Sequence, residues 1–132
     1  MTNDWLNDVV IVNESRDERQ AGDISIFRNA GEACGCLEYW WVQNGEGFAF
    51  TAAGDRLTLG VDERDRVFVS GRQNAAEGHG IVLGWLQSMA SALLEVRRAK
   101  ASRGKIPMGS AEEQGQLPTS VEGLIAYLGF DR

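Results

Sequence analysis

His79 is the only histidine of the chain, and histidine is the side chain best suited to acid–base catalysis near neutral pH. It lies between two glycines, which indicates a polar loop residue ahead of a helix. Catalysis would also need a nucleophile and an orienting acid, and neither lies at a sequence spacing from His79 that is typical of a catalytic motif. The sequence therefore favours a protein that is not an enzyme. The alternative is a small-ligand-binding or enzymatic domain with its pocket between sheet and long helix, near His79.

Cys34 and Cys36 are the only cysteines. A structural zinc site needs about four ligands, and His79 is the only histidine that could join them. A disulfide between residues two apart is geometrically poor because such side chains diverge on a helix. We therefore expect two small semi-buried thiols, no metal site and no cofactor.

Three acids, Asp62, Glu63 and Asp65, occur within one short segment and resemble a cation site superficially. The segment lacks the glycine and the distal glutamate of an EF-hand loop, and arginines separate the acids. A solvated hairpin turn is the better interpretation.

Four tryptophans are more than a core of this size usually needs, and Trp40 and Trp41 are adjacent. Neighbouring residues of a regular helix or strand cannot both face inward, so one of the two is a candidate exposed aromatic. An exposed tryptophan beside acids is typical of an interface hot spot. Equally open is a helix end at which both rings are mostly covered.

The formal net charge of −6 is unevenly distributed. Residues 1–65 hold 13 acids and 5 bases, whereas residues 66–132 hold 6 acids and 8 bases. An acidic half disfavours nucleic acid as a partner, because phosphates would be repelled. It favours a basic protein, although solubility alone would also explain the acids.

The length of 132 residues and the hydrophobic content of 43% predict a single α+β domain over residues 1–132. β-Branched or alternating apolar residues predict strands, and the short connections of the last three require antiparallel pairing. We expect an antiparallel sheet of about four to five strands, at 9–12, 23–27, 48–50, 57–61 and 67–69.

One long helix and two short helices should pack on this sheet. A short helix begins after the N-cap Asn29 and ends in the tryptophan pair, and a capping box at 119–122 begins the other. The long helix, 81–102, is so apolar around Trp85 that we expect burial on more than one side, with a possible homodimer through it. Its basic last turn suits the helix dipole. We expect polar loops at 13–22, 73–80 and 105–117.

The chain has no apolar run long enough to span a bilayer, and its first residues lack the features of a signal peptide. We therefore expect a cytoplasmic protein that does not contact a membrane.

Three segments carry a resemblance to a known group of proteins: ISIF at 24–27, LEYWWV at 37–42 and FAFTAAGDRL at 48–57. Residues 23–72 resemble small bacterial immunity proteins encoded beside polymorphic (Rhs, contact-dependent or type VI) toxins. This chain departs from their pattern at Tyr39, where a proline is expected, and at Asp55, between the turn glycine and the arginine. The resemblance implies a non-enzymatic inhibitor that binds one toxin tightly.

We therefore expect an immunity-type protein that neutralises a cognate, basic toxin by protein–protein contact. One tryptophan would anchor the acidic surface, and surrounding carboxylates would form its charged rim. The expected partner-binding residues are Glu38, Trp40, Trp41, Asp62, Glu63 and Asp65.

Overall fold

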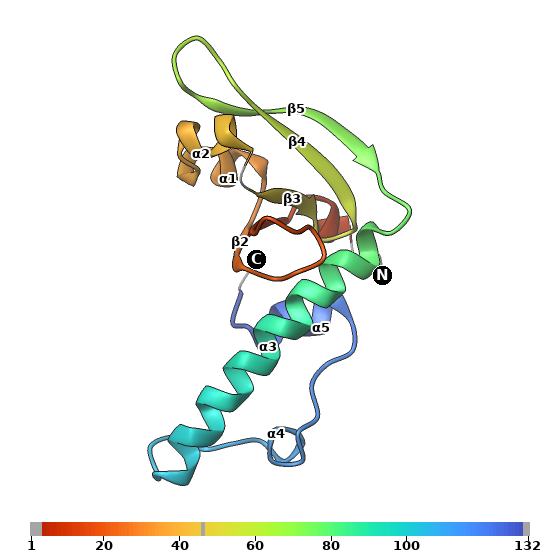
Figure 1. Ribbon diagram of the computed structural model, residues 1–132. Coiled ribbons are helices and arrows are strands. Elements are labelled where there is room, and N and C mark those ends of the chain that lie inside the picture. The colour runs from red at the N-terminus through yellow and green to blue at the C-terminus, as the bar shows by residue number, and fades with distance from the viewer. Residues whose placement is uncertain (1–3, 46, 131–132) are drawn as a thin grey trace. The chain divides into compact units, whose positions relative to one another are not determined.

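A computed structural model describes residues 4–45 and 47–130 (Figure 1). The contacts divide the chain into two compact units. We call them the N-terminal unit, which runs to Trp85, and the C-terminal unit, which begins at Leu86. The expected α+β class is confirmed, whereas the single domain stays a prediction.

In the described part of the chain, five strands form one fully antiparallel sheet, which lies in the N-terminal unit. Its spatial order is β2-β1-β3-β4-β5. The expected meander of β3, β4 and β5 is therefore joined to the N-terminal hairpin of β1 and β2 by the pairing of β1 with β3. β5 is longer than predicted and occupies part of the expected 73–80 loop. The strands are β1 Val10–Glu14, β2 Asp23–Phe27, β3 Phe48–Thr51, β4 Asp55–Val61 and β5 Val67–Asn74.

Two short helices, α1 (Ala30–Cys36) and α2 (Tyr39–Asn44), pack on one face of the sheet. Asn29 caps α1 as predicted, because its side-chain oxygen accepts a hydrogen bond of 2.8 Å from the Glu32 amide. The core beneath them is apolar, as alternation along the strands requires. Its buried members are Val10, Val12, Ala33, Trp41, Ala49 and Leu57.

The expectation of one continuous helix up to the tryptophan pair is wrong. Leu37 and Glu38 are extended, with ψ angles of 136° and 133°, and separate α1 from α2. Gly31 and Gly35 lower the helix propensity of α1, so little energy opposes this break. α2 then ends at Gly45, whose left-handed φ of 64° suits glycine.

The opposite face of the sheet meets the first turns of α3 (Gly78–Ser102). Phe50 and Trp85 are fully buried there, with ring centroids 5.3 Å apart in an edge-to-face arrangement. Ile11, directly opposite Phe50 in the sheet register, is buried beside them.

The polar segment after β1 is a surface loop, as predicted, but Asn13 belongs to the strand and several long-range contacts hold the loop. The buried Asn13 side chain donates to the Gln20 carbonyl at 2.8 Å and accepts from the Gly22 amide at 2.7 Å. The Glu18 carboxylate binds Arg56 through two nitrogens, at 2.7 and 3.2 Å. Trp85 donates its indole N–H to the Glu18 carbonyl at 2.7 Å.

α3 carries a buried stripe along its length. It begins at Gly78, three residues before the predicted start. Val96 is exposed, as are polar residues of the helix such as Gln87 and Ser91. Trp85 is only 1% exposed, and the homodimer through this helix stays a prediction. The buried stripe consists of Ile81, Val82, Trp85, Leu86, Ala90 and Leu94.

The C-terminal unit contains the rest of α3 with α4 (Ser110–Glu113) and α5 (Val121–Tyr127). Glu112 links all three helices. Its carboxylate accepts two hydrogen bonds from Arg97, at 2.6 and 3.0 Å, and one from the Tyr127 hydroxyl at 2.8 Å. These bonds hold the pKa of Glu112 at about 2, below its ordinary 4.5.

Two predictions for this unit need correction. The 105–117 connection contains α4 and is held by the ion pair between Glu112 and Arg97, so it is not wholly a loop. The cap of α5 is Ser120, whose hydroxyl accepts from the Gly123 amide at 3.0 Å, and not Thr119.

Within 4–45 and 47–130, no helix is both long enough and apolar enough to cross a membrane.

Candidate functional site

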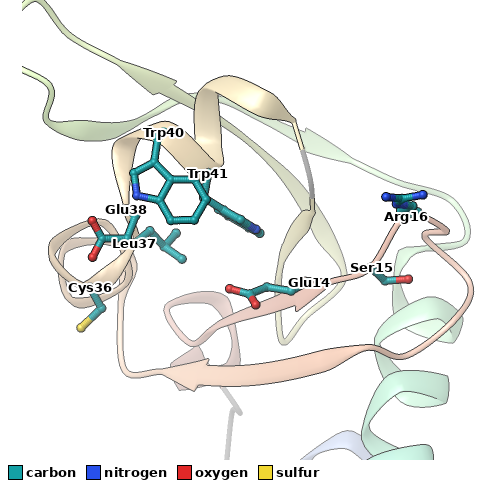
Figure 2. Close-up of a pocket in the computed structure, with 8 residues that line it drawn as sticks. All are labelled: Glu14, Ser15, Arg16, Cys36, Leu37, Glu38, Trp40 and Trp41. Carbon is teal, nitrogen blue, oxygen red and sulfur yellow. The ribbon is translucent and has the colours of Figure 1, made fainter.

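A hollow of about 500 Å³ lies beside α2 in the N-terminal unit (Figure 2). Cys36, Leu37 and Glu38 line it from the end of α1 and the extended joint, and both residues of the tryptophan pair line it from α2. From the other side, Glu14 at the end of β1 and the following Ser15 and Arg16 complete the lining. We call this feature the Trp40 hollow.

The adjacent tryptophans have opposite environments. Trp41 is 8% exposed and belongs to the core with Val10 and Ala33, whereas Trp40 is 50% exposed. Figure 2 shows both rings at the hollow, with Leu37 beneath them. Tyr39, at the start of α2, is also exposed, by 40%. The prediction that one tryptophan of the pair would be exposed is thus confirmed, and it is Trp40.

Gly47 makes the inward position of Trp41 possible. A Cβ atom at residue 47 would lie 2.1 Å from Cζ2 of the Trp41 indole and 2.8 Å from the Asn13 carbonyl oxygen. Only glycine therefore leaves room for the indole, which forms the floor of the hollow.

Two acids border the hollow without an ion-pair partner among the described residues, Glu14 and Glu38. Glu14 also lies directly opposite Asp23 in the β1–β2 register. Like charges in this position disfavour the sheet by a few tenths of a kcal/mol to about 1 kcal/mol. Arg16 is the one basic residue in the lining, and Figure 2 shows it at the loop end, away from Trp40.

The acids of the β4–β5 turn do not line this hollow. The carboxylate of Asp62 accepts hydrogen bonds from the backbone amides of Arg64 and Arg66, both at 2.9 Å. The hydrogen bond from the Arg66 amide lowers the pKa of Asp62 most, and the one from the Arg64 amide lowers it further. Asp62 therefore organises the turn, and its expected role as a rim charge stays a prediction. Glu63 and Asp65 are exposed, with Asp65 in the left-handed region at φ 59°.

The six predicted partner-binding residues thus occupy two places. Glu38, Trp40 and Trp41 come together at the hollow, and Asp62, Glu63 and Asp65 form the hairpin tip. Sequence reasoning missed Glu14. A signal for it exists, because extending the first strand by two residues places Glu14 on the same face as Val10 and Val12.

His79 is exposed in the first turn of α3 and was expected in a loop. It lines a second open hollow of about 550 Å³ with Arg19, Glu77 and residues of the helix, and no strand residue takes part. Arg19 and Glu77 are ion-paired there. This lining offers neither a serine nor a cysteine that His79 could activate.

The two cysteines differ in environment. Cys34 is partly buried, and burial raises the pKa of its thiol, which makes it less reactive. Cys36 is exposed, contrary to the expected semi-buried position, and lies at the border of the hollow. The described residues contain no group of three or more histidine, cysteine or acidic side chains placed to hold a metal ion.

These features make the Trp40 hollow the best candidate for a binding surface. Comparisons of the chain with protein-family models, with curated proteins and with solved structures gave no match.

Proposed function

We propose that the protein is an immunity-type inhibitor that binds a bacterial toxin directly and neutralises it in the cytoplasm of the producing cell. Its binding surface is centred on Trp40 and bordered by Tyr39, Glu38 and Glu14. The resemblance of residues 23–72 to immunity proteins is the reason for naming a toxin as the partner.

The exposure of Trp40 is the observation that carries the proposal. A half-exposed tryptophan costs solvation and contributes little to the core, which already uses Trp41 and Trp85. Tryptophan and tyrosine are the residues most often found at energetic centres of interfaces, because they bury much area with few rotatable bonds. Tyr39 and Trp40 form such a pair on one exposed turn.

Electrostatics supports a basic partner. Glu14 and Glu38 flank the exposed ring, and Asp23 adds a third carboxylate through the β1–β2 register. A basic surface would neutralise this charge and gain from steering during the approach. The exposed Glu63 and Asp65 of the hairpin tip would add to the steering.

The test begins with capture of the tagged protein from the bacterium that encodes it, at moderate and high salt. We expect a stoichiometric basic protein that is lethal when expressed alone and harmless when co-expressed with this chain. Isolation of the chain alone, or with a harmless protein, would contradict the proposal.

A substitution series then tests the surface. Trp40→Ala should weaken toxin binding by roughly 30-fold or more, the loss typical of a hot-spot residue. Phe68→Ala is the matched control, since Phe68 is a 44% exposed aromatic on β5 outside this surface. Equal affinities of the two variants, measured by calorimetry, would exclude Trp40 as the anchor.

The ligand-binding alternative has its own test. It places the active group at the hollow beside His79 and requires that His79→Ala abolish an activity without loss of stability. A His79→Ala variant that still protects cells from the toxin would favour the inhibitor.

A further inference from the structure

We propose that the Trp40 hollow receives an arginine side chain of the bound protein, whose guanidinium group lies over the Trp40 indole between two carboxylates. The inference rests on the proposed function, because the arginine belongs to the bound toxin, and it names the chemical group that the surface recognises.

The arrangement of the lining matches the chemistry of a guanidinium group. Its flat, weakly hydrated surface stacks on aromatic rings, and its N–H groups bind carboxylates in pairs. The hollow offers the exposed Trp40 ring and the apolar side chain of Leu37, with Glu14 on the strand side and Glu38 on the helix side (Figure 2). A lysine ammonium could bind the acids but would not match the flat apolar surface as well.

The size of the hollow also fits. Pockets that hold small ligands have volumes of about 300–1,000 Å³. At about 500 Å³, the hollow admits a long side chain together with part of the backbone that carries it. The opening is on the surface, so the side chain can enter without movement of α2.

The carboxylates beside Trp40 have no basic partner within the described part of the chain. Four carboxylates elsewhere in the N-terminal unit are each paired with an arginine: Glu18, Asp55, Asp62 and Glu77. Glu14, Asp23 and Glu38 have no such partner among the described residues. Arg16 lies at the far end of the hollow and leaves the carboxylates beside Trp40 without a cation (Figure 2). An arginine from outside would give Glu14 and Glu38 the kind of partner that the fold gives to these four carboxylates.

An NMR titration of the full chain tests this inference without the toxin. The probe is N-acetyl-arginine amide, and its neutral isostere N-acetyl-citrulline amide is the reference. We expect the arginine compound to bind with a dissociation constant on the order of millimolar and to shift the indole N–H signals of Trp40 and Trp41. The citrulline compound should leave these signals in place.

Variants make the test specific. Trp40→Ala should weaken arginine-amide binding by about tenfold, and the double variant Glu14→Gln with Glu38→Gln should weaken it at least as much. The double variant Glu95→Gln with Glu113→Gln changes the net charge equally at exposed acids outside the hollow and should bind like the wild type.

Equal shifts with arginine and citrulline compounds would overturn the inference, as would equal losses in the two charge variants. Toxin binding and arginine-amide binding together distinguish a failure of this inference from a failure of the proposed function. If Trp40→Ala loses toxin binding while the arginine compound does not bind at Trp40, the inhibitor stands and the arginine assignment fails.

Discussion

Replacing Gly47 by alanine tests whether the floor of the Trp40 hollow depends on close packing. The added Cβ would lie 2.1 Å from Cζ2 and 2.6 Å from Cη2 of the Trp41 indole. It would also lie 2.8 Å from the Asn13 carbonyl oxygen, which belongs to the central part of the sheet and cannot move freely. The indole must therefore shift out of a core that it shares with Val10, Val12 and Ala33.

The expected cost follows from the rigidity of packed cores. Inserting a methyl group into a well-packed site typically lowers the free energy of unfolding by about 1–3 kcal/mol. At an ordinary urea dependence for a small protein, this loss lowers the unfolding midpoint by roughly 1 M. The slope of the transition should not change, because the surface exposed on unfolding is nearly the same.

Tryptophan fluorescence in urea is the appropriate assay. All four tryptophans, at positions 5, 40, 41 and 85, precede Leu86, so the signal follows the N-terminal unit. Gly35→Ala is the matched control, because a Cβ there meets no other atom within 4 Å. Alanine within α1 should raise stability by about 0.5–1 kcal/mol.

A second substitution shows whether the Trp41 indole is the cause. Trp41→Phe removes the ring atoms nearest to the added methyl group, so it should cost less in the Gly47→Ala background than in the wild type. We expect a coupling energy of about 0.5–3 kcal/mol between the two positions. A Gly47→Ala protein as stable as the Gly35→Ala control, or strictly additive effects, would refute the packing explanation.

Three further predictions concern hydrogen-bonded side chains. Asn13→Ala should lower the free energy of unfolding by about 1–3 kcal/mol in urea, because the Gly22 amide and Gln20 carbonyl lose their partner; an unchanged midpoint would contradict this. The pKa of Glu112 is about 2 in the folded chain and about 4.5 unfolded, so its stabilisation is complete above pH 4.5 and is lost as pH falls toward 2. Thermal unfolding followed by circular dichroism should show that Glu112→Gln flattens the pH dependence of stability in this window. Parallel stability curves for the wild type and the variant would exclude this contribution of Glu112. Asp62→Asn and Glu63→Gln remove the same charge, yet only the first should speed amide exchange of Arg66 at the hairpin tip.

The sheet could be predicted from the sequence because its signals are local. Strands at 9–12, 23–27 and 48–50 follow from β-branched or alternating residues, and the short connection after Val61 requires antiparallel pairing. The Asn29 cap depends on one side chain and the next turn, and it was predicted correctly.

The errors arise where tertiary packing decides. The break at Leu37 and Glu38 directly precedes α2, whose Trp41 is buried in the core. For α5, Thr119 and Ser120 are both acceptable caps by residue type, and only the folded chain shows that Ser120 takes this place. The hollow itself joins residues 14–16 to residues 36–41, a pairing that no spacing in the sequence contains.

The contacts that hold the loop after β1 have a consequence for folding kinetics. Glu18 reaches Arg56 across 38 positions of the chain and Trp85 across 67, and Arg19 reaches Glu77 across 58. Closing such long loops costs entropy before any contact repays it, so these bonds should form only after the meander and the first turns of α3. Substitutions in this loop should then accelerate unfolding while leaving the folding rate nearly unchanged. The loop that carries Arg16 to the border of the hollow should therefore fold last in the N-terminal unit and unfold first.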